Sequence, residues 1–267
     1  MKVGVFTPAE RDPHHHKVLA AFADGVRNTG AECFVNPVEQ FAPCDAAVVF
    51  GVRKKAVAYS KHRGTIFDTM RRDKKPVVVI DSGYVNRDTY FMVGLNGLNG
   101  RADFRNENCG PDRWEALGVE LKPYRDEGDH ILVCGQIPWD ASVQDFDHEK
   151  WCLDIVHKLK KITPRPIRFR PHPKIARAPL PPIEHDLERA YAVVTFSSNS
   201  GVDAAIAGIP VFALDKGSMA WPVSSHDLTY IHNPLKPPRE PWAFNLAYTQ
   251  WTLEEMKEGL PWRHLTR

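Results

Sequence analysis

A hydroxyl-rich turn between two apolar runs is the segment of this sequence best suited to chemistry. Residues 193–212 read VVTFSSNSGVDAAIAGIPVF, and the turn holds Ser197, Ser198, Asn199 and Ser200. A buried strand here would deliver these side chains onto a helix N-terminus, where free backbone N–H groups and the helix dipole attract anions. The pattern therefore predicts a phosphate site at these four residues. The alternative is a plain helix cap, for which one serine is enough.

A histidine between two prolines forms the second segment. Residues 168–174 read RFRPHPK, so His172 has a stiffened backbone and neighbouring cations. Such a histidine can donate a hydrogen bond to a phosphate oxygen. We expect His172, Arg170 and Lys174 to bind phosphate, although a lone loop histidine is more often an ordinary surface residue.

The third segment, CGQIPWDAS at 134–142, follows another apolar run, and its Gly135 permits close approach of a ligand to the backbone. The order GQ-x-P-x-D-A-S, R-x-R-P-H-P, T-x-S-S and G-x-D-A-A-x-A-G-I-P-V-F resembles the donor-binding half of capsular-polysaccharide (Kdo-type) glycosyltransferases. The His-Pro and Ser-Ser elements are also similar to those of bacterial sialyltransferases. The resemblance covers roughly residues 131–214.

That resemblance implies a GT-B-like α/β architecture, in which two Rossmann-like doubly wound domains face a cleft that holds a nucleotide-sugar. It implies that His172, Ser197 and Ser198 contact the donor phosphates. It further implies a donor pocket lined by Gly135, Gln136, Asp140 and Ser142. We expect a UDP- or CMP-sugar as donor, with no tightly bound cofactor and no metal.

Glycosyl transfer to a hydroxyl with inversion needs a general base, which we expect in the strand-to-helix loops of the first domain. Glu10, Asp12 and His14 are the candidates in the first such loop, and Asp81 is another at the end of a β-branched run. Asp12 has an alternative role as the N-cap of a helix that begins at Pro13. The run His14–His16 is a poor metal site, because consecutive helical residues point about 100° apart.

Basic residues are concentrated in two segments of a chain whose net charge is only +2. Residues 51–75 carry a local +7 and residues 158–177 a local +8. Solvated helix faces are one interpretation and a polyanionic ligand is the other. The acceptor-side candidates are Arg53, Lys54, Lys55, Lys61, Arg63, Arg71 and Arg72. They make double-stranded DNA a candidate partner, with a hydroxymethylated pyrimidine flipped out as the acceptor of a phage-type DNA-base glycosyltransferase.

Strand–helix alternation occurs twice and must position these residues. The first half predicts strands at 3–6, 31–35, 46–50 and 77–81, with helices from Pro13 to Gly30 and over 56–72. The second half predicts strands at 131–134, 166–170, 192–195 and 210–214, with helices over 145–161, 184–190 and 201–207. A Thr252–Glu255 capping box predicts a last helix over 253–258. We therefore expect an acceptor-side domain over 1–121, a linker over 122–130, a donor-binding domain over 131–245, and a C-terminal helix over 246–267 that packs toward the first domain.

The remaining features of the sequence concern the cellular compartment and the alternative functions. The five cysteines are odd in number and lack a CxxC pair, which favours a reducing cytoplasm, that of the host if the protein is phage-encoded. The N-terminus is too quickly polar for a signal peptide, and no apolar run is long enough to cross a membrane, so we expect no membrane partner. Three alternatives stay open: a GT-B-like sugar-nucleotide epimerase, a DNA-base transferase with a non-sugar donor, and a non-catalytic nucleic-acid binder.

Overall fold

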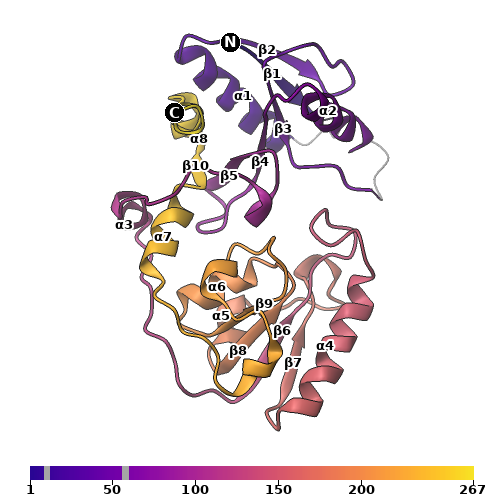
Figure 1. The fold of residues 1–267 in the computed structure, drawn as a ribbon, viewed down its shortest axis with the longest axis vertical. Coiled ribbons are helices and arrows are strands. Elements are labelled where there is room, and N and C mark those ends of the chain that lie inside the picture. Colours follow the sequence, from indigo (N-terminus) through magenta and orange to yellow (C-terminus); the bar gives the residue numbers. More distant parts are fainter. Residues whose placement is uncertain (9–12, 56–59) are drawn as a thin grey trace. The chain divides into compact units, whose positions relative to one another are not determined.

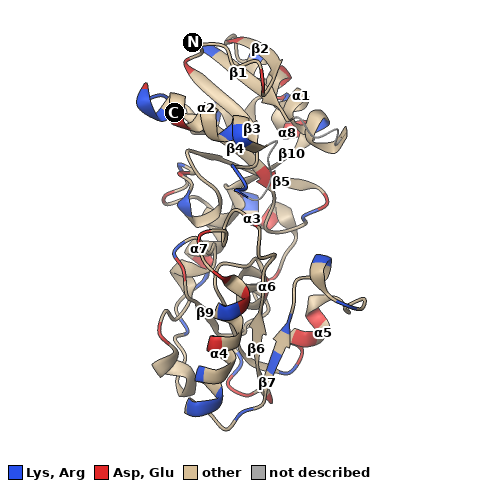
Figure 2. Ribbon diagram, turned by 90° about the vertical axis from the view of Figure 1, so that its right-hand side faces the viewer, with Lys and Arg blue, Asp and Glu red and all other residues tan. Residues whose placement is uncertain are grey.

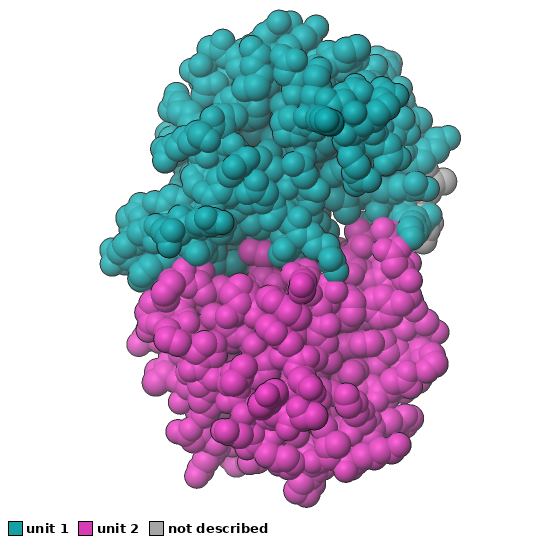
Figure 3. All heavy atoms as spheres, in the orientation of Figure 1, with its two compact units in different colours: residues 1–117, 244–267 teal, residues 118–243 magenta. Residues whose placement is uncertain are grey.

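The structure is a computed structural model that describes residues 1–8, 13–55 and 60–267. The chain divides into two compact units, residues 1–117 with 244–267, and residues 118–243 (Figure 3). Each unit has its own sheet and helices (Figure 1). The expected α/β class with two parallel-sheet bodies is confirmed.

Unit 1 is built on a six-stranded sheet in the order β10-β5-β4-β3-β1-β2. Its strands are β1 (Lys2–Thr7), β2 (Glu32–Pro37), β3 (Ala46–Phe50), β4 (Val77–Ser82), β5 (Tyr90–Leu95) and β10 (Gln250–Thr252). Its helices are α1 (Pro13–Asn28), α2 (Lys61–Arg72), the 3-10 turn η2 (Asn99–Arg101), α3 (Asp112–Leu117), the end of α7 (Glu240–Ala247), α8 (Leu253–Lys257) and α9 (Leu260–Leu265).

Strands β1 to β4 of unit 1 run parallel, and the chain order reverses between β1 and β3. Four consecutive β-branched residues from Val77 to Ile80 are fully buried in β4, as expected for a strand covered on both faces. Val18, Leu19, Phe22 and Val26 recur at helical spacing in α1 and are all buried against this sheet.

The C-terminal segment completes unit 1. Strand β10 pairs antiparallel with β5, and the expected capping box at α8 is confirmed, with Thr252 and Glu255 each accepting from the other's backbone N–H. Helix α8 then packs closely on α1, where a Cβ on Gly25 would lie 1.8 Å from the carbonyl oxygen of Met256. The absent side chain of Gly25 is thus what permits this contact.

Unit 2 is built on a four-stranded parallel sheet in the order β7-β6-β8-β9. Its strands are β6 (His130–Cys134), β7 (Ile167–Arg170), β8 (Ala190–Thr195) and β9 (Val211–Ala213). Its helices are α4 (His148–Ile162), α5 (Ile183–Leu187), α6 (Ser200–Ile206), the start of α7, and the 3-10 turns η3 (Pro173–Ile175), η4 (Trp221–Val223) and η5 (Leu228–His232). The chain order reverses between β6 and β8, just as it does between β1 and β3.

Some elements differ from the expectation. Residues 122–130, expected as a linker, belong to unit 2, where the N–H groups of Lys122 and Arg125 bond to the carbonyls of Ile206 and Gly208. The expected strands do not include β5, which contains Gly94. A Cβ there would lie 2.6 Å from the ring of Phe104, so the glycine makes room for that ring.

Candidate functional site

The three motifs of unit 2 all follow strands that end at the same edge of its sheet. Parallel strands share one carboxyl edge, and ligands of such sheets bind there, where the strand order reverses. The histidine motif follows β7 and the serine motif follows β8, which are not neighbours in the sheet. Strand β6 lies between them and pairs Cys134 with both Arg170 of β7 and Thr195 of β8. The Gln136 segment is therefore the centre of the arrangement.

Gln136 is buried and joins three parts of the edge. Its Nε2 donates to Ser142 Oγ at 2.9 Å and to Ser197 Oγ at 3.2 Å. Its Oε1 accepts from the backbone N–H of Ser197 at 2.9 Å. Gln136 and Ser197, both expected to contact a ligand, thus contact each other across the point where the strand order reverses. They fix the two loops rather than present polar atoms outward.

His148, which the sequence patterns did not indicate, is hydrogen-bonded to the loop that contains Gln136. Its Nε2 accepts from the backbone N–H of Gln136 at 2.9 Å, and its ring stacks on Trp151. Burial lowers the pKa of His148, so the ring is neutral at pH 7 and Nδ1 carries its proton. The N-cap Asp147 marks the start of α4 in the sequence, but no local pattern indicates that the first helical side chain reaches β6.

A turn formed by Asp140 and Ser142 also supports the Gln136 side chain. Asp140 Oδ1 accepts from the backbone N–H of Ser142 at 3.0 Å and from its Oγ at 2.8 Å. The Ser142 hydroxyl therefore donates to Asp140 and accepts from Gln136, which fixes its proton. Asp140 and Ser142 are both half-buried.

The serines in the turn after β8 differ in their exposure to solvent. Ser197 is buried, whereas Ser198, Asn199 and Ser200 are half-exposed. The Ser198 N–H is held by Thr195 Oγ1 at 3.1 Å, and the Ser198 and Ser200 hydroxyls lie 3.0 Å apart. Asn199 occupies the N-cap of α6 without a side-chain cap bond. Ser198 and Ser200 are thus the paired hydroxyls at this edge.

His172 is oriented by the backbone that follows it. It occupies the N-cap of η3, and its Nδ1 accepts from the Lys174 N–H at 3.2 Å. Burial, with a further contribution from Lys174, lowers the pKa of His172. The ring is therefore neutral at pH 7, and its Nε2–H is a fixed donor.

The cations of this motif do not all face the same way. Arg170 is buried, forms an ion pair with Asp186 and donates to the Pro181 carbonyl at 2.8 Å, so it ties β7 to the segment around α5. The basic positions of β7 and the acidic positions of α5 stand side by side in Figure 2. Lys174 is exposed. Of the two expected phosphate-binding cations, Lys174 is the one at the surface.

Gly135 makes room for an aromatic ring. A Cβ there would lie 3.0 Å from Cζ of Phe169, and the Gly135 N–H donates to the Arg170 carbonyl at 2.9 Å. The space that we expected a ligand to occupy beside Gly135 is lined by the half-exposed Phe169 ring.

The candidate bases of unit 1 are described only in part. Glu10 and Asp12 lie outside the described residues. His14 is exposed at the start of α1, with its ring centroid 5.2 Å from that of Phe91. Asp81 lies at the carboxyl end of β4, and a Cβ on Gly51 would lie 3.6 Å from its Oδ2. Both described candidates are at the carboxyl edge of the unit 1 sheet.

The basic stretch 51–75 is not one continuous face. Helix α2 has 12 residues, or about 18 Å, and runs from the carboxyl edge of β3 to the amino edge of β4. The carboxyl edge of β3 carries four of these residues: Arg53, Lys54, Lys55 and Lys61. Arg63 is buried and donates to the Phe50 carbonyl at 2.8 Å.

At the amino edge of β4, Arg71 and Arg72 each have an acidic neighbour. Arg71 lies 3.9 Å from Asp68, and Arg72 lies 2.9 Å from Asp73. The basic residues of 51–75 are therefore divided between two edges of the unit 1 sheet.

The chain is similar to two solved Kdo transferase structures from Thermosulfurimonas dismutans. It is 14% identical to the KpsC β-Kdo 2,4 transferase, over 94% of this chain and 92% of that one, with a TM-score of 0.59. It is 12% identical to the KpsC β-Kdo 2,7 transferase, over 97% and 98%, with a TM-score of 0.55. The fold is GT-B-like. No protein-family model and no curated protein matches the chain.

Two further findings bear on this GT-B-like chain. Within 1–8, 13–55 and 60–267, no group of three or more His, Cys, Asp or Glu residues is arranged to hold a metal ion. No helix of the same described part is long and apolar enough to span a membrane. At the unit 2 edge the His172 Nε2–H, the Ser198 and Ser200 hydroxyls and the exposed Lys174 can donate to an anion, and the Asp140 carboxylate acts electrostatically on His172.

Proposed function

We propose that the protein is a glycosyltransferase that moves a sugar from a nucleotide-sugar to a hydroxyl acceptor. The observation that carries the proposal is the common edge of β7, β6 and β8. There the His172 Nε2–H follows β7 and the Ser198 and Ser200 hydroxyls follow β8, and Gln136 ties the loop after β6 to the loop after β8. The likeness to Kdo transferases in fold supports the same class of reaction.

The proposed role of this edge is to bind the donor phosphate. Negative charge grows on the phosphate as the glycosidic bond breaks, and preoriented donors stabilise that charge without reorganising. His172 suits this role because its Nδ1 is already occupied by the Lys174 N–H, which leaves Nε2–H as the donor. Lys174, Ser198 and Ser200 add one positive charge and two hydroxyls.

The donor is proposed to be a UDP- or CMP-sugar, bound without a metal. The proposed general base comes from Asp12, Glu10 or His14, with Asp81, at the carboxyl end of β4, as a further candidate. The position of Asp81 at the carboxyl end of a parallel strand supports it, since ligands of such sheets bind at that edge.

A direct experiment measures nucleotide binding and turnover for His172→Ala. We expect UDP or CMP to raise the melting temperature of the unmodified chain. Turnover with the matching nucleotide-sugar should fall about 10²–10³-fold in the variant, because one contact to developing charge is lost. His172→Gln, which can place an amide N–H near the lost Nε2–H, should recover part of the rate.

The matched control is His157→Ala, an exposed histidine on α4. It should leave binding and turnover unchanged. If His172→Ala kept full activity but lost several degrees of melting temperature, His172 would be structural and the phosphate role would be wrong. Interconversion of two nucleotide-sugars without an acceptor would indicate the epimerase instead.

The finer proposal is a hydroxymethylated pyrimidine in DNA as acceptor. Arg53, Lys54 and Lys55 support it, because they follow β3 at the carboxyl edge of unit 1. A gel shift tests it with hydroxymethylated and plain duplexes of one sequence. Binding that is equal for both duplexes, or absent, would exclude this acceptor while leaving the glycosyltransferase proposal intact.

A further inference from the structure

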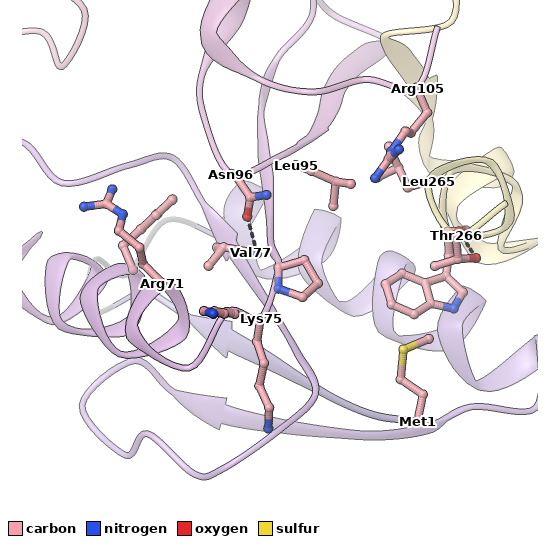
Figure 4. A pocket seen from close by; sticks show the side chains of 13 residues that line it. Met1, Arg71, Lys75, Val77, Leu95, Asn96, Arg105, Leu265 and Thr266 are labelled. Atoms are coloured by element: carbon pink, nitrogen blue, oxygen red, sulfur yellow. Dashed lines mark hydrogen bonds between the residues drawn. The ribbon is translucent and has the colours of Figure 1, made fainter.

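A second candidate site lies in unit 1, away from the carboxyl edges. A pocket of about 580 Å³ opens where β4 begins and β5 ends, beside α9 (Figure 4). Its volume falls within the range of small-molecule sites. Val77, the first residue of β4, lines it, so it is at the amino edge of the parallel strands. Gly51 and Asp81 are at the opposite edge, and the pocket is therefore distinct from the proposed transferase site.

The lining combines cations with an apolar floor. Arg71, Lys74, Lys75 and Arg105 line the pocket, and no aspartate or glutamate is among its lining residues. Trp262, Leu265, Leu95 and Val77 supply the apolar surface. In Figure 4 the side chains of Arg71 and Arg105 flank this floor from two sides.

The acidic neighbours of these cations are weak competitors. The Lys75 ammonium is engaged away from the pocket, since its Nζ donates to the Cys44 carbonyl at 2.7 Å and lies 3.6 Å from Asp45. Arg71 and Arg105 face Asp68 and Asp103 at 3.9 and 3.1 Å, but all four side chains are at least half exposed. Ion pairs this exposed contribute little, so an anion in the pocket can replace them.

Lys74 stands where a glycine is normally found. It follows the end of α2 with φ 54°, its N–H bonds to the Arg71 carbonyl, and the Lys75 N–H bonds to the Met70 carbonyl. This is a Schellman ending, whose left-handed residue is usually glycine because a Cβ is unfavourable there. Lys74 therefore has a charged side chain at a backbone position where glycine would cost the fold less.

Arg105 repeats this feature on the other side of the pocket. Six described non-glycine residues have positive φ; four are asparagines, which tolerate it, and the other two are Lys74 and Arg105. Both line this pocket, which Asn96, another of the six, also lines. Backbone strain of this kind concentrates at ligand sites, where the side chain has a role beyond the fold.

We propose that this pocket binds a small organic anion with an apolar body, of the aryl or alkyl carboxylate, sulfonate or phosphate-ester class. Lys74, Arg71 and Arg105 bind the anionic group. The floor around Trp262 and Leu265 receives the apolar body.

The test compares two fluorescent probes of one shape on the full chain. 8-Anilinonaphthalene-1-sulfonate carries the anion, and N-phenyl-1-naphthylamine is its neutral counterpart. We expect the sulfonate to bind at least tenfold more tightly. Lys74→Gly combined with Arg105→Gly should weaken sulfonate binding at least tenfold, with the melting temperature equal or higher because both glycines relieve strain.

Two controls decide between this pocket and other surfaces. Arg72→Ala removes the neighbouring cation that does not line the pocket and should leave the sulfonate affinity unchanged. Lys74→Asn, which tolerates the same backbone, should reproduce part of the loss. Equal affinity for the two probes, or sulfonate binding that survives the double substitution or is abolished by His172→Ala, would overturn the proposal. None of these results decides the transferase function.

Discussion

The backbone N–H of Gln136 donates to Nε2 of His148 at 2.9 Å, while the Gln136 side chain bonds to Ser142 and Ser197. One residue thus connects the end of β6 to the first turn of α4 and to the loop after β8. The placement of Ser198 and Ser200 depends on this connection, because both follow directly from Ser197, which Gln136 holds.

Gln136→Ala is expected to lower the free energy of unfolding by about 2–4 kcal/mol. It removes the Gln136 partners of the buried Ser197 N–H and Ser197 hydroxyl, and each unpaired buried group costs about 1–3 kcal/mol. Urea unfolding followed by circular dichroism measures the effect. Gln40→Ala, at an exposed position of unit 1, is the control and should change stability by less than about 0.5 kcal/mol. An unchanged midpoint for Gln136→Ala would show that the network contributes nothing to stability.

The two serines before α6 should separate stability from turnover. Ser197→Ala removes hydroxyl bonds to the buried Gln136 and is expected to cost about 1–2 kcal/mol of stability. Ser198→Ala should leave the melting temperature nearly unchanged. Its turnover should fall less than that of His172→Ala, because nearby backbone N–H groups remain. Paired melting and turnover measurements on both variants check this, and reversed effects would exclude the division of roles.

Stability should fall as pH decreases below about 6.5, the usual histidine pKa. Burial lowers the pKa of His148 in the folded protein, so between the folded and unfolded values the unfolded chain binds more protons. This histidine contributes up to about 1.4 kcal/mol per pH unit within that window. His130, His172 and His264 have lowered pKa values too and add to the slope.

The measurement is urea unfolding at pH 7.5, 6.5 and 5.5. His148→Gln should reduce the slope of stability against pH, and the exposed His157→Gln should not. A slope that is identical in His148→Gln and the unmodified chain would remove His148 from this account.

Gly25→Ala is expected to destabilise unit 1 by about 1–3 kcal/mol or more. The new Cβ would lie 1.8 Å from the Met256 carbonyl oxygen, so α1 and α8 must separate. Gly64→Ala in α2 is the matched control, because its Cβ meets only the flexible Arg53 side chain at 2.7 Å. The control should be neutral or slightly stabilising, since alanine favours helix by about 1 kcal/mol. Equal melting temperatures for the two variants would contradict the close packing of α1 on α8.

The sequence by itself determined the elements that rest on local periodicity and local caps. The β-branched run Val77–Ile80, the Pro13 start of α1 and the Thr252–Glu255 capping box all produced the expected structures. These patterns act within a few residues, so their physical cause is visible in the chain. The strands expected before the segments 134–142, 168–174 and 195–201 are present as β6, β7 and β8.

The tertiary structure alone decided what each polar side chain in those segments does. Strand order placed β6 between β7 and β8, so Gln136 met Ser197, and Arg170 met Asp186, a residue 16 positions away. The same is true of Lys74 and Arg105, which share a pocket although 31 positions separate them. Hydrogen bonds and ion pairs act over about 3–4 Å, and only the folded chain determines which distant residues come that close.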